Sequence, residues 1–139
     1  MDGLVSRRVI SLELALLSRV RDEALSRDLS LAIAVVDDGG HVVASQRMDG
    51  AALGAMKLAV GKAYTSVLWG APTGDFMQST QPGGDDWGWN STDPQIVVYA
   101  GGLPLLVDGE LVGGVGASGA SAADDAECVS AAMRSLSFD

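Results

Sequence analysis

Four polar side chains near the middle of the chain have the types and spacing needed to bind an anion or move a proton. Arg47 ends a strand-like run, and Asp49 follows it in a turn. Lys62 and Thr65 lie three residues apart in the helix-like segment 53–69, so both point to one side of that helix. If strand and helix meet, the four converge. Arg47 and Lys62 would then clamp an anion that Asp49 or Thr65 orients.

The same group allows two other interpretations. A desolvated Lys62 or the Asp49 carboxylate could transfer a proton, which would make these two the catalytic residues of an enzyme. Alternatively, Asp49 forms an ion pair with Arg47 or Lys62 that only fixes the turn. The residue types alone do not decide between an anion clamp, a proton-transfer site and a structural ion pair.

Glycine-rich stretches form a second candidate binding region. Gly101 and Gly102 precede Pro104, where glycine permits positive backbone angles or a close approach of main chain to ligand. The run 113–119 contains four glycines and leads toward a predicted helix, so its N–H groups and Ser118 could hold a carboxylate or phosphate. Tight packing of strand on helix explains the same glycines. The spacing does not fit the dinucleotide-binding fingerprint, so NAD is excluded.

The composition excludes several enzyme classes. The 139 residues include one His and one Cys, too few for the usual zinc sites, and we predict no metal site. No phosphate-binding loop or serine-nucleophile motif is present.

The charge of the chain argues against nucleic acids and anionic membranes as partners. The formal net charge is −9, and residues 63–133 contain no Lys or Arg. Basic side chains in such a protein, Arg47 and Lys62 among them, create local positive spots that suit anions. No apolar run approaches the roughly 20 residues of a membrane span, and the N-terminal pattern is not that of a signal peptide. We therefore expect a cytoplasmic protein.

Hydrophobic periodicity and turn signals predict a single α+β domain over residues 1–139. Expected helices cover 11–27, 53–69 and 121–136, and expected strands cover 31–37, 41–47, 96–100, 103–107 and 110–115. Tight turns at 38–40 and 108–109 imply an antiparallel sheet with helices packed on it. Between them, the irregular segment 74–94 contains Phe76, Met77, Trp87 and Trp89. It should cover the core or a subunit interface, or else close over a ligand.

Five short motifs occur in order along the chain. They are Asp37-x-x-Gly40, Arg47-Met48-Asp49-Gly50-Ala51, Lys62-Ala63-Tyr64-Thr65, Gly101-Gly102-Leu103-Pro104 and Gly113–Gly119 with Asp124 beyond. From about residue 11 to residue 136 the chain resembles the GlcG/HbpS family, whose members include haem-binding proteins and the C-terminal domain of PduO-type corrinoid adenosyltransferases. The resemblance implies a profilin-like sandwich, with an antiparallel sheet of about five strands between helices, and assembly into homo-oligomers.

The resemblance favours a small-molecule-binding domain that takes haem, a corrinoid or a smaller organic anion near the junction of the sheet and helix 53–69. The expected ligand-binding residues are Arg47, Asp49, Lys62, Thr65, Gly101, Gly102 and Ser118. His41 falls in a hairpin turn, and the first helix lacks the His that ligates haem in PduO-like relatives. The alternative is a cofactor-independent isomerase, lyase or cyclase that acts on a carbonyl compound by proton transfer through Lys62 and Asp49.

Overall fold

The computed structural model describes residues 2–136, with side chains from residue 10 onward. Three α-helices and four strands make up the body of the domain. The helices are α1 (Asp2–Ser26), α2 (Ala55–Trp69) and α3 (Ala122–Ser135). The strands are β1 (Ala32–Asp37), β2 (Val42–Arg47), β3 (Gly102–Val107) and β4 (Glu110–Ser118). Two short 3₁₀ helices, Thr73–Phe76 and Trp89–Ser91, lie between α2 and β3.

The strands form one sheet in the order β2-β1-β4-β3, with every neighbouring pair antiparallel. The two predicted tight turns join β1 to β2 and β3 to β4. Asp108 and Gly109 have φ values of 52° and 80°, as a two-residue hairpin turn with both central residues left-handed requires. At the other turn, the Asp37 carboxylate accepts hydrogen bonds from the backbone N–H groups of Gly39 and His41. The α+β architecture with an antiparallel sheet is confirmed.

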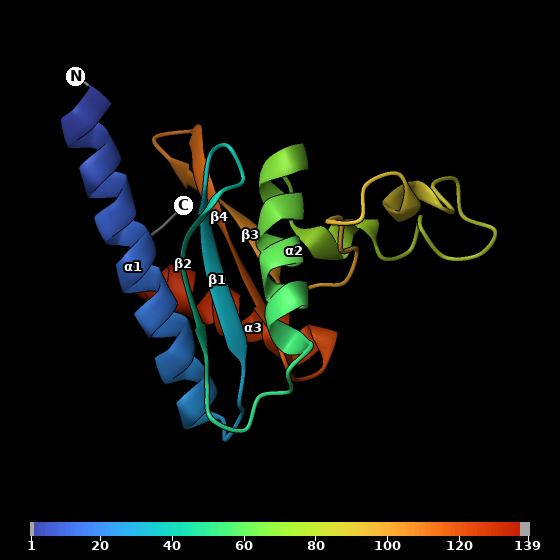
Figure 1. Ribbon diagram of the computed structural model, residues 1–139, viewed down its shortest axis with the longest axis horizontal. Coiled ribbons are helices and arrows are strands. Elements are labelled where there is room, and N and C mark those ends of the chain that lie inside the picture. Colours follow the sequence, from blue (N-terminus) through green and yellow to red (C-terminus); the bar gives the residue numbers. More distant parts are fainter. Residues whose placement is uncertain (1, 137–139) are drawn as a thin grey trace.

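Helices cover both faces of the sheet. In Figure 1, α2 lies on one face, while α1 and α3 lie on the other. β1 runs through the middle and is buried from Ala32 to Val36, so its side chains alternate between the two layers. Ile33 and Val35 join the cluster under α1 and α3, whereas Ala34 and Val36 face α2.

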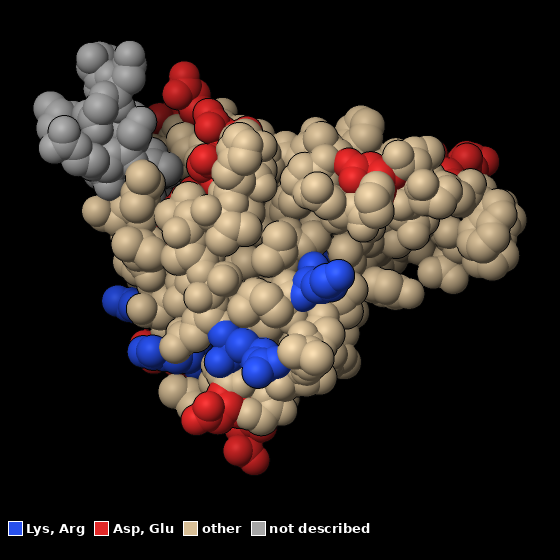
Figure 2. Space-filling model, in the orientation of Figure 1, with Lys and Arg blue, Asp and Glu red and all other residues tan. Residues whose placement is uncertain are grey.

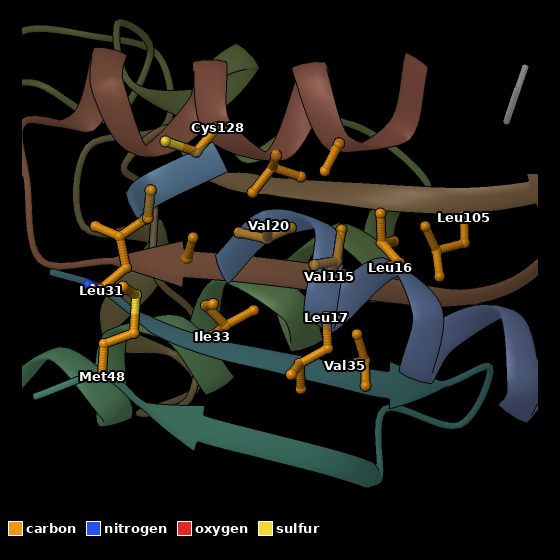
Figure 3. Close-up of a cluster of buried hydrophobic side chains, with 14 residues drawn as sticks. Leu16, Leu17, Val20, Leu31, Ile33, Val35, Met48, Leu105, Val115 and Cys128 are labelled. Carbon is orange, nitrogen blue, oxygen red and sulfur yellow. Dashed lines mark hydrogen bonds between the residues drawn. The ribbon is translucent and has the colours of Figure 1, made fainter. Parts of the chain in front are cut away.

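The main hydrophobic core lies between the sheet and the helices α1 and α3 (Figure 3). Large aliphatic side chains from all three elements meet there, including Leu16 and Val20 of α1, Val115 of β4 and Val129 of α3. The free Cys128 is also in this cluster, where burial raises the pKa of its thiol. It therefore packs as a small apolar residue.

The opposite layer, between α2 and the sheet, is built from small residues. A Cβ added to Gly114 would lie 2.8 Å from the Ala63 carbonyl oxygen, and one added to Gly116 would collide with the Ala59 carbonyl oxygen. The backbone of α2 therefore rests directly on β4. Tight packing of strand on helix accounts for these two glycines.

The predicted strand 96–100 is wrong, and the sheet has four strands in the described part of the chain. A turn bond from the Ile96 N–H to the Asp93 carbonyl and contacts with side chains take hydrogen bonds of this segment, and no neighbouring strand within the described residues does. The Val97 N–H donates to Thr65 Oγ1 at 3.0 Å, and Thr73 Oγ1 donates to the Tyr99 carbonyl at 2.7 Å. A continuous apolar, β-branched run can therefore lie beside a helix instead of joining the sheet.

The other elements differ from the prediction only in where they begin or end. For example, α1 begins at Asp2, and β4 continues to Ser118.

None of the helices within residues 2–136 combines the length and apolarity that crossing a membrane requires. In the same part of the chain, no three His, Cys, Asp or Glu side chains are grouped as a metal site would need.

Candidate functional site

Lys62 is held in a buried ion pair that joins α2 to α3. Its ammonium group donates to Asp125 Oδ2 at 3.0 Å and to the Ala117 carbonyl at 2.9 Å, and both charged side chains are 2% exposed. The second Asp125 oxygen accepts from the Ala120 N–H at 2.9 Å. Burial lowers the pKa of Lys62, and the nearby Asp125 carboxylate opposes that shift. The pair clamps the two helix layers together beside the end of β4.

Gly101 and Gly102 make room for this lysine. Gly101 has a φ of 130°, and a Cβ there would lie 2.9 Å from Lys62 Nζ and 2.6 Å from the Ala117 carbonyl oxygen. A Cβ on Gly102 would overlap the Lys62 carbonyl oxygen. These glycines therefore closely approach Lys62, a residue of the chain itself, and Gly101 has the positive backbone angle that glycine permits, while their contact with a ligand stays a prediction.

Thr65 and Ser118 are buried nearby and also face protein groups. Thr65 is fully buried, and its hydroxyl accepts from Val97, so it ties the segment after residue 94 to α2. Ser118 is 5% exposed at the end of β4, where it pairs with Ala32 of β1.

Arg47 and Asp49 lie in a different place. Arg47 pairs with Ala32, which in turn pairs with Ser118, so two strand spacings of roughly 10 Å in total separate Arg47 from Ser118. The two residues line a surface hollow between α1 and the end of β2. The seven predicted residues therefore form two groups, one around Lys62 and one around Arg47. The convergence of Arg47 with Lys62 is not observed, and the charged partner of Lys62 is Asp125 instead of Asp49.

Sequence reasoning missed Asp125. It belongs to the acidic first turn of α3, where the Ser121 hydroxyl caps the helix by accepting from the Asp124 N–H at 3.1 Å. Two adjacent aspartates at a helix start are typical of capping, so nothing local marks one as buried. The usable signal was Lys62 itself, because a lysine among Ala, Gly and Val on a buried helix face requires a carboxylate partner.

A mostly apolar hollow of about 590 Å³ lies beside α2. On the helix side it is lined by Met56, Lys57, Leu58, Val60 and Gly61, and on the other side by Pro94, Gln95 and Val97. Lys57 is the one charged residue of this lining. Its volume falls within the roughly 300–1,000 Å³ typical of small-molecule sites. None of the seven predicted residues lines this hollow.

The irregular segment after α2 projects away from the body of the domain (Figure 1). Its aromatic side chains pack on one another: the Trp89 ring centroid is 5.2 Å from those of both Trp69 and Phe76. The Tyr64 hydroxyl donates to Asp93 at 2.6 Å, which fixes the end of the segment to α2 and raises the pKa of Tyr64. Trp87 remains 65% exposed. The segment therefore walls the α2 hollow at Pro94 and beyond, while its tip reaches outward.

His41 lines neither the hollow beside α2 nor the hollow between α1 and β2. Its side chain is 82% exposed in the β1–β2 turn, with Nδ1 3.3 Å from the Asp37 carboxylate.

A family model described as haem degrading protein HbpS-like matches residues 11–134. The chain belongs to this HbpS-like family. It is 35% identical to the protein GlcG of Escherichia coli K12 over 104 residues, which are 75% of each chain. Among solved structures, it is similar to the Klebsiella pneumoniae protein ORFY, with a TM-score of 0.88, 26% identity and coverage of 92% of this chain and 89% of that one. It is also similar to PduOC in a complex with haem, with a TM-score of 0.86, 28% identity and coverage of 90% of this chain and 91% of that one.

A structural neighbour of this chain has thus been solved in a complex with haem and shares nearly the whole fold.

Proposed function

We propose that this HbpS-like chain is a small-molecule-binding domain that takes haem, or else a corrinoid, in the hollow beside α2. The observation that carries the proposal is the hollow itself: a largely apolar lining with a single cation at Lys57. A flat apolar ring bearing carboxylates matches that combination, because the ring replaces water against the aliphatic wall and the ammonium pairs with one carboxylate.

The residues of the hollow fit the chemistry of haem. Haem iron is held in proteins by His, Cys or Tyr side chains, or by Met together with His, and Met56 supplies a thioether in this lining. Lys57, which is exposed, would pair with a carboxylate of the ring, and Val60 would contact its face. Bound haem would supply redox chemistry and a visible absorption band, and this chain would supply the apolar cover and the charge.

A titration of the purified protein with haemin tests this assignment. We expect a saturable shift of the Soret band near one haem per chain. Lys57→Gln should weaken binding about fivefold, the effect of losing one solvent-exposed charge pair. Met56→Leu should change the position of the band while the far-UV circular dichroism stays unchanged.

Arg134→Gln is the matched control, because it removes one exposed positive charge at α3, outside the α2 hollow. Equal weakening by Arg134→Gln and Lys57→Gln would show that only net charge matters, and would contradict the location. The absence of any saturable shift would overturn the haem assignment.

We also propose that the chain forms a homo-oligomer through its projecting segment. Trp87 is 65% exposed at that segment, and Trp69 is 52% exposed beside it. Exposed tryptophans of this kind are typical anchors of protein interfaces. Trp87→Ser should raise the dissociation constant of the oligomer by roughly tenfold or more, measured by light scattering over a concentration series. Leu53→Ser, which alters a more exposed apolar residue before α2, should have a much smaller effect. A monomeric wild-type protein would contradict the proposal.

A further inference from the structure

A second hollow, of about 290 Å³, lies between the last turns of α1 and the end of β2, and its lining brings two arginines together. Arg21 comes from α1 and Arg47 from the last position of β2. Ser30 and Gln46 add a hydroxyl and an amide. No residue lines both this hollow and the one beside α2, so the inference below does not rest on haem binding.

The guanidinium groups in this hollow lack protein partners for much of their hydrogen-bonding capacity. Among the side chains that the structure describes, Arg47 lies within 4 Å of no carboxylate. Within the described part of the chain, Arg21 Nε is buried without a hydrogen-bond partner, and Arg21 makes one ion-pair contact, a long one of 3.7 Å to the exposed Asp22. The Arg21 side chain as a whole is 40% exposed and Arg47 is exposed, so the terminal guanidinium nitrogens of both can reach a group from outside the chain.

The electric field around the hollow also favours an anion. The chain carries a net charge of −9, yet Figure 2 shows Lys and Arg side chains gathered over the lower parts of α1, β2 and α2 in this view. A local positive region on an acidic protein attracts small anions and leaves nucleic acid repelled by the rest of the surface.

We propose that Arg21 and Arg47 form a binding site for a small organic carboxylate. Guanidinium groups match the flat geometry of a carboxylate with paired N–H donors. Leu25 and Met48, which also line the hollow, give the carbon skeleton an apolar wall that inorganic phosphate would not use. Asp49 at the same hollow disfavours a second negative charge on the ligand, so a monocarboxylate is preferred.

The test is an NMR titration of ¹⁵N-labelled protein with sodium butyrate, and separately with sodium phosphate, at constant ionic strength. Butyrate should cause saturable shifts of the amides of Gln46, Arg47 and Met48. Arg21→Gln and Arg47→Gln should each raise the butyrate dissociation constant about tenfold, as expected for the loss of a hydrogen bond to a charged group. Arg47→Lys keeps the positive charge but not the paired N–H donors of the guanidinium group, so it should lose part of the affinity for butyrate.

Arg134→Gln is again the matched control, and dispersed spectra of all variants establish that they fold. Shifts that never saturate, or equal loss in Arg134→Gln, would overturn the site. Phosphate binding as tight as butyrate binding would overturn the carboxylate assignment. A negative result with butyrate leaves the haemin titration unaffected, because the two hollows share no residue.

Discussion

Replacing Lys62 with methionine should lower the free energy of unfolding by about 3–5 kcal/mol, measured by urea denaturation at neutral pH. The substitution would leave the Asp125 carboxylate, which is 2% exposed, without its only ion-pair partner within the described residues. Methionine retains most of the volume of lysine, so an empty cavity contributes little to the loss.

The double variant Lys62→Met/Asp125→Asn separates the ion pair from mere packing. Asparagine keeps an oxygen that can accept from the Ala120 N–H, while no charge remains buried. The double variant should therefore be more stable than Lys62→Met alone, with clear non-additivity. Lys57→Met, on the exposed side of the same helix, should change stability by less than about 0.5 kcal/mol. Additive effects of the two single changes would contradict the clamp.

The second large effect concerns pH and Glu13. This residue of α1 is 1% exposed and abuts Gly113 of β4, and its two carboxylate oxygens have no hydrogen-bond partner among the residues that the structure describes. Burial, reinforced by repulsion from Asp37 and Asp38 at the β1–β2 turn, raises the pKa of Glu13 from 4.5 to about 8. The remaining titratable group of that turn, His41, is exposed and paired with Asp37.

The sign of the pH dependence follows from these values. Between pH 4.5 and 8 the folded chain keeps a proton on Glu13 that the unfolded chain has lost, so stability falls as pH rises through this range. The loss is about 1.4 kcal/mol per pH unit at most, or an upper limit of about 5 kcal/mol over the whole window.

Glu13→Gln should flatten this part of the profile, because an amide cannot lose the proton, and unfolding curves measured from pH 4.5 to 9 would show it. Glu110→Gln, an exposed position at the start of β4, is the control and should retain the wild-type slope. A wild-type profile that rises across this window would show that Glu13 does not govern it.

The elements of the fold were predictable wherever a local signal specifies them. Asp108-Gly109 required a hairpin, and the four-residue apolar spacing of Leu12, Leu16 and Val20 required a helix. The segment 96–100 could not be assigned in this way. Its apolar residues satisfy a strand pattern, but the partners that hold it, Thr65 and Thr73, are side chains brought near by the tertiary fold.

The candidate site shows the same division. The sequence marks Lys62 and Arg47 as unusual cations, but not that the sheet places them in separate groups. The partner of Lys62 lies 63 positions away in α3, and Arg21, the second arginine beside Arg47, faces the hollow from α1. These pairings depend on how the helices lie against the sheet, and no spacing along the chain encodes them. The Lys57 hollow likewise requires Pro94 and Val97 to fold back against α2.

The two layers of the domain, one filled by large side chains and one where backbone packs on backbone, should tolerate amino-acid substitutions differently during evolution. Between the sheet and the pair α1 and α3, aliphatic side chains can exchange volume with their neighbours, so several compensating combinations are compatible with the fold. Under α2, backbone meets backbone at Gly114 and Gly116, and no neighbour can shrink to admit a larger residue. Substitutions should therefore accumulate between the sheet and the helices α1 and α3, and should be selected against between the sheet and α2. Changes in the lining of the α2 hollow would have to come from the solvent-facing positions of that helix or from the facing segment at Pro94, Gln95 and Val97.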